Sequence, residues 1–140
     1  MKFDTNIFEL YRTTDSISEK EKLGELIVEV CENYLAEIVK THRKYEDFPS
    51  WLDSDYSPDR GSLSLVDIEE DTIVVRYSDS WRYGGHCDFE IHLKINDVLT
   101  FNANSLEVSV KNKRIAKLRQ EIVGHKKKIT EAEKKIEELQ

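Results

Sequence analysis

A seven-residue apolar repeat runs through the last third of the chain, residues 104–140, and constrains the fold more than any other feature of the sequence. Val or Ile occupies one position of each heptad, and a mixture of Leu, Ala, Lys and His occupies the second. β-Branched residues at the first position with Leu at the second are typical of two parallel helices that supercoil around each other. We therefore predict a coiled-coil helix that joins two copies of the chain, with an interface of Val108, Ile115, Leu118, Ile122, His125, Ile129, Ala132, Ile136 and Leu139.

The same helix has a second interpretation, in which it folds back on its own domain. A helix of about 36 residues is about 54 Å long. A body of about 100 residues has a radius of gyration of about 13 Å, so an overhang is expected. Gly124 and the polar seam residues Lys111 and His125 weaken the seam. Asn104 is the expected N-cap, but residues 105–110 also alternate like a strand. The pattern leaves open whether the helix pairs in parallel, antiparallel or within one chain.

Charge divides the chain into two parts. Residues 1–110 carry 11 Lys and Arg against 23 Asp and Glu, a net charge of −12, whereas residues 111–140 carry 10 against 5, a net charge of +5. We therefore divide the chain into an acidic α+β body, residues 1–103, and a basic coiled-coil helix, residues 104–140. Because an acidic surface repels nucleic acid and attracts basic proteins, we expect a basic protein partner and no direct contact with nucleic acid. The alternative is that the acidic residues serve only solubility.

Three features bear on the compartment. No apolar stretch approaches the roughly 18 residues that indicate a membrane-spanning helix. The first residues, Met1–Asp4, lack the apolar segment of a secretory signal. Cys31 and Cys87 fall on apolar faces of a predicted helix and a predicted strand, so we expect reduced thiols. We therefore expect a cytoplasmic protein with no membrane partner.

The first 103 residues predict an α+β fold, in which an N-terminal helix packs on a three- or four-stranded antiparallel sheet. Residues 3–12 form a short helix or arm, and a capping box at Ser18 and Glu21 begins a helix that ends near Tyr45. Strands are expected at 62–69, 72–78 and 86–95, and a single helical turn at 97–102. The inward face of the long helix is predicted to hold Leu23, Leu26, Ile27, Val30, Cys31, Tyr34, Leu35, Ile38 and His42.

The connection of residues 45–61 mixes aromatic and acidic side chains. Connections above about 12 residues are usually functional or disordered, and the aromatic content favours an ordered loop. We take Trp51, Asp53, Asp55 and Tyr56 as partner-binding candidates. A calcium loop is excluded, because Pro58 and Ser64 stand where the EF-hand pattern requires Gly and Glu.

The loop that joins the last two strands is the first candidate for partner binding. Its residues Trp81, Arg82, Tyr83, Gly84 and Gly85 combine the side chains that are enriched at binding hot spots with glycines that let the backbone turn. The alternative is that Trp81 and Tyr83 fold back on the sheet as a small core.

This loop resembles an element of small uncharacterised proteins of phages and prophages. In those proteins an aromatic residue precedes Tyr-Gly-Gly between two strands of an α+β body, and the matching residues here are Trp81, Tyr83, Gly84 and Gly85. The resemblance covers residues 72–99. It implies a phage context, in which small acidic proteins bind and block host machinery, and it brings no activity or site residue with it.

Polar residues alternate along the last predicted strand, as His86, Asp88, Glu90 and His92. Histidine and carboxylates at about 6.6 Å intervals suit zinc or manganese. An exposed strand face is polar for simpler reasons, so we expect no bound metal and no cofactor. A nuclease-type cluster of Asp88, Glu90 and Lys94 has the wrong spacing, and the acidic body would repel its substrate.

Together these observations predict a non-catalytic, protein-binding homodimer. The most concrete form is a phage-type accessory protein in the host cytoplasm that binds and inhibits a host protein of defence or nucleic-acid handling, through acidic mimicry. One alternative is a small-ligand-binding protein or metal-dependent enzyme that uses the region from Trp81 to His92. The other is a structural adaptor.

Overall fold

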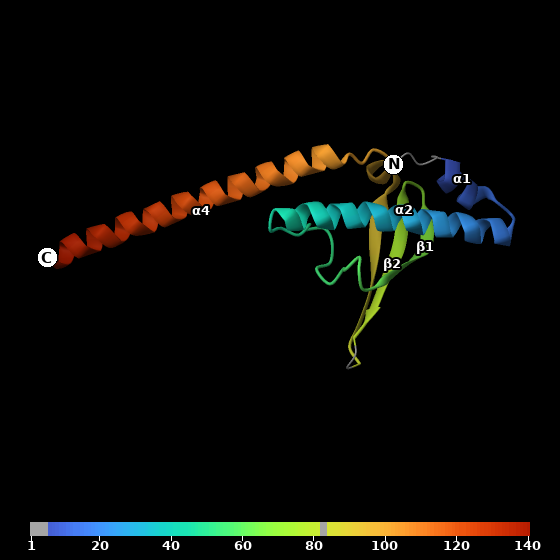
Figure 1. Ribbon diagram of the computed structural model, residues 1–140, viewed down its shortest axis with the longest axis horizontal. Helices are drawn as coiled ribbons and strands as arrows, with labels where there is room; N and C mark the ends of the chain where they lie inside the picture. Colours follow the sequence, from blue (N-terminus) through green and yellow to red (C-terminus); the bar gives the residue numbers. More distant parts are fainter. Residues whose placement is uncertain (1–5, 82–83) are drawn as a thin grey trace.

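The computed structural model describes residues 6–81 and 84–140 and confirms the α+β class (Figure 1). A short helix α1 (Asn6–Thr13) precedes the long helix α2 (Ile17–Lys44), and three strands follow: β1 (Ser62–Glu69), β2 (Thr72–Ser80) and β3 (His86–Lys94). A single turn of helix, α3 (Ile95–Leu99), leads into α4 (Ala103–Leu139).

The sheet is an antiparallel meander in the order β1-β2-β3, so β1 and β3 are its two edges. The pairing of β2 with β3 runs without a break from Thr72 opposite Lys94 to Ser80 opposite His86. The pairing of β1 with β2 is interrupted by a bulge at Val66, where the register shifts. The two edges therefore differ, because a bulge bends and twists a strand.

Helix α2 covers one face of the sheet, and the core lies between them (Figure 1). Its buried residues agree with the predicted stripe except at three positions. Tyr34 is only partly buried, although it packs against the core. Leu26 is 50% exposed, and Val39, which the prediction omitted, is buried. Leu26 lies about 100° around the helix from Ile27, at the border of the buried stripe. The core is built from Phe8, Ile27, Val30, Cys31, Leu35, Val39, Leu52, Tyr56, Ile68, Ile73, Val75, Tyr77, Ile91, Leu93 and Val98.

The N-caps of both long helices lie two residues earlier than predicted. Ser16, and not Ser18, caps α2, because its Oγ accepts the backbone N–H of Glu19 at 3.2 Å. Asn102, and not Asn104, caps α4, because its Oδ1 accepts the backbone N–H of Ser105 at 3.0 Å. Residues 105–110 are helical, so the fourth strand is not formed, and the basic helix begins one residue before the predicted boundary.

Helix α4 touches the body only near its N-terminal end and then projects away from it (Figure 1). Val110 is buried at this base. The carboxylate of Glu107 accepts hydrogen bonds from Lys44 and, at 2.9 Å, from the hydroxyl of Tyr45. Arg114 forms an ion pair with Glu46 at 3.0 Å. The expected overhang is therefore present.

Two further expectations concern the membrane and the cysteines. Within residues 6–81 and 84–140, no helix is long and apolar enough to cross a membrane. Cys31 and Cys87 are both free, as predicted. Burial and, to a smaller extent, the nearby carboxylate of Glu32 raise the pKa of the Cys31 thiol to about 12, so this thiol stays protonated in the core.

We predict that two adjacent residues of α2 differ sharply in their contribution to stability. Ile27 is fully buried, so Ile27→Ala leaves a cavity and should lower the free energy of unfolding by about 2–5 kcal/mol. The adjacent Leu26→Ala should cost about 0.5 kcal/mol or less, as at other surface sites. Urea unfolding followed by circular dichroism measures both. Equal losses would contradict this orientation of α2.

The attachment of α4 should depend on pH through Glu107. Hydrogen bonds from Lys44 and Tyr45 lower the pKa of Glu107 below its ordinary value. Ionisation of Glu107 therefore stabilises the attachment above the ordinary carboxyl pKa, and this contribution is lost as the pH falls through the lowered one. In an NMR titration we expect the methyl signals of Val110 to shift with the Glu107 carboxyl.

The control for this titration is Glu107→Gln, which removes the titrating group and keeps the size of the side chain. Its Val110 signals should resemble the acid form of the native protein already at neutral pH. If the chemical shifts of the Val110 methyl groups in the native chain do not change as Glu107 titrates, the base of α4 is held without this carboxylate.

Candidate functional site

The loop of residues 45–61 is ordered by contact with the sheet, as its aromatic content predicted. Leu52 and Tyr56 are buried in the core. The ring of Tyr56 lies 5.0 Å from the ring of Tyr77 in β2, which lies 5.1 Å from that of Phe89 in β3. The Tyr77 hydroxyl accepts the backbone N–H of Ser57 at 3.2 Å. Tyr56 was predicted to bind a partner, but it is only 2% exposed, so its ring is a core residue and is removed from the candidate surface.

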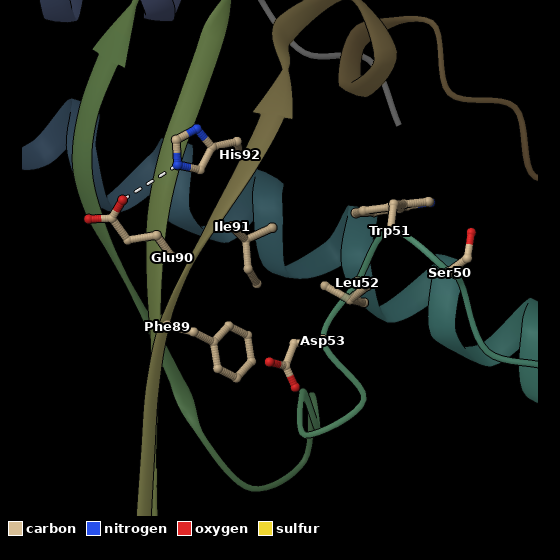
Figure 2. A pocket seen from close by; sticks show the side chains of 8 residues that line it. All are labelled: Ser50, Trp51, Leu52, Asp53, Phe89, Glu90, Ile91 and His92. Carbon is tan, nitrogen blue, oxygen red and sulfur yellow. Dashed lines mark ion pairs between the residues drawn. The ribbon is translucent and has the colours of Figure 1, made fainter.

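This loop forms one wall of a groove of about 500 Å³, and β3 forms the other (Figure 2). Trp51 on the loop is 52% exposed, whereas Leu52 and Ile91 are buried. Figure 2 shows Phe89 and Ile91 on the side of β3 that faces the loop, and Glu90 and His92 on the other side. The groove is lined by Ser50, Trp51, Leu52, Asp53, Phe89, Glu90, Ile91 and His92.

Four consecutive residues of β3 line this groove, so it opens along the edge of the strand rather than over one face. Among the strands that the structure describes, β3 is an outer strand that pairs with β2 alone. In the part of the chain that the structure describes, no backbone hydrogen bond joins the loop to β3. The groove therefore borders a row of unpaired backbone N–H and C=O groups.

Of the predicted loop residues, Trp51 and Asp53 line the groove, whereas Asp55 does not. Asp53 takes part in no ion pair within residues 6–81 and 84–140, although its Oδ1 accepts the backbone N–H of Asp55 at 2.9 Å. At the start of β3, burial raises the pKa of the Cys87 thiol, and the carboxylates of Asp55, Asp79, Asp53 and Asp88 contribute to the same shift.

The hairpin tip is only partly described. Arg82 and Tyr83, both predicted to bind the partner, lie outside the described residues. Trp81 is 37% exposed, and the guanidinium carbon of Arg60 lies 5.7 Å from its ring centroid. A Cβ placed on Gly85 would stand 3.0 Å from the same ring, and Gly84 has a φ of 86°, which favours glycine. Trp81 therefore packs partly against its own hairpin, which agrees with the alternative of a small core.

The alternating polar residues of β3 form ion pairs with β2 and with each other. Arg76 lies 3.6 Å from Asp88 and 3.4 Å from Glu90, and Nε2 of His92 lies 3.4 Å from Glu90. In the described ranges, residues 6–81 and 84–140, no three His, Cys, Asp or Glu side chains are grouped to hold a metal ion. His86, Asp88, Glu90 and His92 are therefore explained as an exposed strand face.

Sequence reasoning missed the part that Phe89 and Ile91 play in the groove. Their alternation with polar residues marked them only as core-facing. The available signal was the meander itself, because the last strand of three consecutive antiparallel strands is an edge unless another segment pairs with it. The position of Trp51 beside that edge depends on the folding of the loop and has no local signal.

Comparison with known proteins adds no relative. No protein-family model, no curated protein and no solved structure matches the chain. The resemblance to phage proteins therefore stays a prediction.

We predict that the loop wall depends on the close approach of Gly61 to Tyr77. A Cβ at Gly61 would lie 2.3 Å from the Tyr77 ring, so Gly61→Ala should lower the free energy of unfolding by about 1–3 kcal/mol. Gly24→Ala is the matched control. A Cβ there meets its nearest side chain at 3.6 Å, and the helix should gain up to about 1 kcal/mol. Urea denaturation measures both, and a neutral Gly61→Ala would contradict this packing.

Proposed function

We propose that this protein is a non-catalytic, protein-binding homodimer, joined through α4 and binding a basic protein partner with its acidic body. The observation that carries the proposal is the apolar seam of α4. Its large apolar residues are 36% to 86% exposed. A helix that stays in solvent has no use for large apolar residues in a heptad repeat, whereas a helix that pairs with a second helix buries them. They are Val108, Ile115, Leu118, Ile122, Ile129, Ile136 and Leu139.

The attachment of α4 to the body leaves this seam free. The residues that hold the base are Glu107, Val110 and Arg114, which follow each other at intervals of three and four and therefore share one side of the helix. Val108 and Ile115 lie on a different side and are exposed. A second α4 is the partner that matches both the length and the register of the seam.

The charges beside the seam support a parallel pair. In that arrangement Glu121 would face Lys126 of the second chain, and Lys128 would face Glu133. Arg114 opposite Arg119 is unfavourable by sequence alone. In the structure, however, Arg114 forms an ion pair with Glu46 of its own chain, which offsets that repulsion.

The acidic body favours a basic protein as the partner. The net charge of residues 1–110 is −12, and Asp53 and Glu90 line the groove. Such a surface attracts a protein that normally binds nucleic acid and speeds the encounter with it. In the phage context that the resemblance implies, this partner is a host protein, and binding blocks its nucleic-acid-binding surface.

We predict that two neighbouring substitutions in α4 separate the seam from the rest of the helix. Ile122→Asp places a charge in the proposed interface and should convert the dimer to a monomer. Val123→Asp makes nearly the same chemical change one residue later, where the side chain is 67% exposed and off the seam, so the dimer should persist. Light scattering at micromolar concentration gives the mass. A native chain that is already a monomer would refute the dimer.

A further inference from the structure

We propose that the open edge of β3 binds an extended segment of the partner protein as a fourth strand, and that this segment alternates basic and apolar residues. The inference deepens the proposed function, on which it rests, by naming the binding mode and the chemistry of the partner. An added strand gains affinity from backbone hydrogen bonds and specificity from alternate side chains.

The two edges of the sheet are not equivalent, and only β3 is suited to this pairing. The bulge at Val66 breaks the ladder of β1, and a bulge is a device that protects an edge from further pairing. β3 pairs regularly with β2 along its whole length. It therefore offers an edge of nine residues without a bulge, which no strand of residues 6–81 or 84–140 pairs on its outer side.

The two sides of this edge require different side chains from the added strand. On the side of the loop, the exposed Trp51 and the partly buried Phe89 offer apolar surface above the buried Ile91. On the opposite side, Asp88 and Glu90 are about half exposed, and the single guanidinium of Arg76 lies near both. Because side chains alternate along a strand, a segment with an apolar residue at every second position and Lys or Arg between them satisfies both sides.

A second copy of the chain is a poorer occupant of the same edge. It would bring its own Asp88 and Glu90 alongside those of the first copy, and like charges on neighbouring strands are destabilising. Asp53 on the loop adds another carboxylate to the groove. Charge complementarity therefore selects a basic segment of another protein.

The test uses the full-length protein and synthetic peptides of about six residues, about 20 Å when extended. The probe alternates Lys and Val. One control has the same composition with the Lys and Val residues in two blocks, and a second is the alternating peptide with N-methyl groups on alternate backbone nitrogens. Fluorescence anisotropy should give binding of the alternating peptide alone, because only that peptide can pair along the edge and fill both sides.

Substitutions in the groove locate the bound peptide. Trp51→Ala should weaken binding by about thirtyfold, as at a hot-spot aromatic residue. Glu90→Lys should weaken it more than Glu69→Lys, which makes the same charge change on the other edge strand. Hydrogen exchange should slow at the outward-pointing amides of residues 89–92 and stay unchanged in β1. Because Trp51 is half exposed, its replacement should leave the fold intact.

The outcomes separate this inference from the proposed function. Equal binding of the alternating, block and N-methylated peptides would support an acidic body that attracts basic proteins but would overturn strand addition. A larger loss from Trp81→Ala than from Trp51→Ala would place the partner at the hairpin tip and would also overturn it. Binding of no peptide would refute both strand addition and the basic partner, whereas the mass of the native chain tests the dimer independently.

Discussion

The side chain of Tyr77 fixes the relation between the long loop and the sheet, and the groove depends on it. Its ring is buried between Tyr56 of the loop and Phe89 of β3, and its hydroxyl lies 3.3 Å from both the Ser57 carbonyl oxygen and a carboxylate oxygen of Asp79. The hydroxyl has one hydrogen to donate, so it serves these acceptors in turn while it accepts the Ser57 N–H. These contacts with Tyr77 hold the loop of residues 45–61 against the sheet, where it forms the wall of the groove opposite β3.

Local sequence patterns predicted the helices and strands of this fold well. The features that they did not predict depend on contacts between segments that are distant in the sequence. The two-residue period of β3 and the heptads of α4 are local signals, and the strand and the helix formed within one or two residues of the bounds that the sequence predicted. The N-cap of α2 was wrong by two residues because Ser16 and Ser18 each have Glu three positions later. Thr14 favours the earlier one by donating to Glu19 at 3.2 Å. The burial of Tyr56 had no local signal, because it results from contact with Tyr77, twenty-one residues later in the chain.

The acidic body and the basic helix are joined by a few polar contacts of opposite charge. Lys44, the last residue of α2, forms an ion pair with Glu107 of α4, and Glu46, two residues later, forms one with Arg114. These pairs are exposed in part, and exposed ion pairs contribute little stability. Together with the buried Val110, they attach the base of α4 to the end of α2. The attachment lies on a different side of α4 from Val108 and Ile115, so these seam residues stay exposed.

The attachment of the body to one end of α4 has a consequence for binding by the proposed dimer. Each chain would contribute one groove, and a parallel pair of α4 helices would place both bodies at the same end. A partner with two suitable segments gains an effective local concentration for its second contact, which raises overall affinity by about 10²–10⁴ when the spacing fits. The gain vanishes when the spacing does not fit, so the proposed dimer would be selective for the separation of the two segments as well as for their sequence.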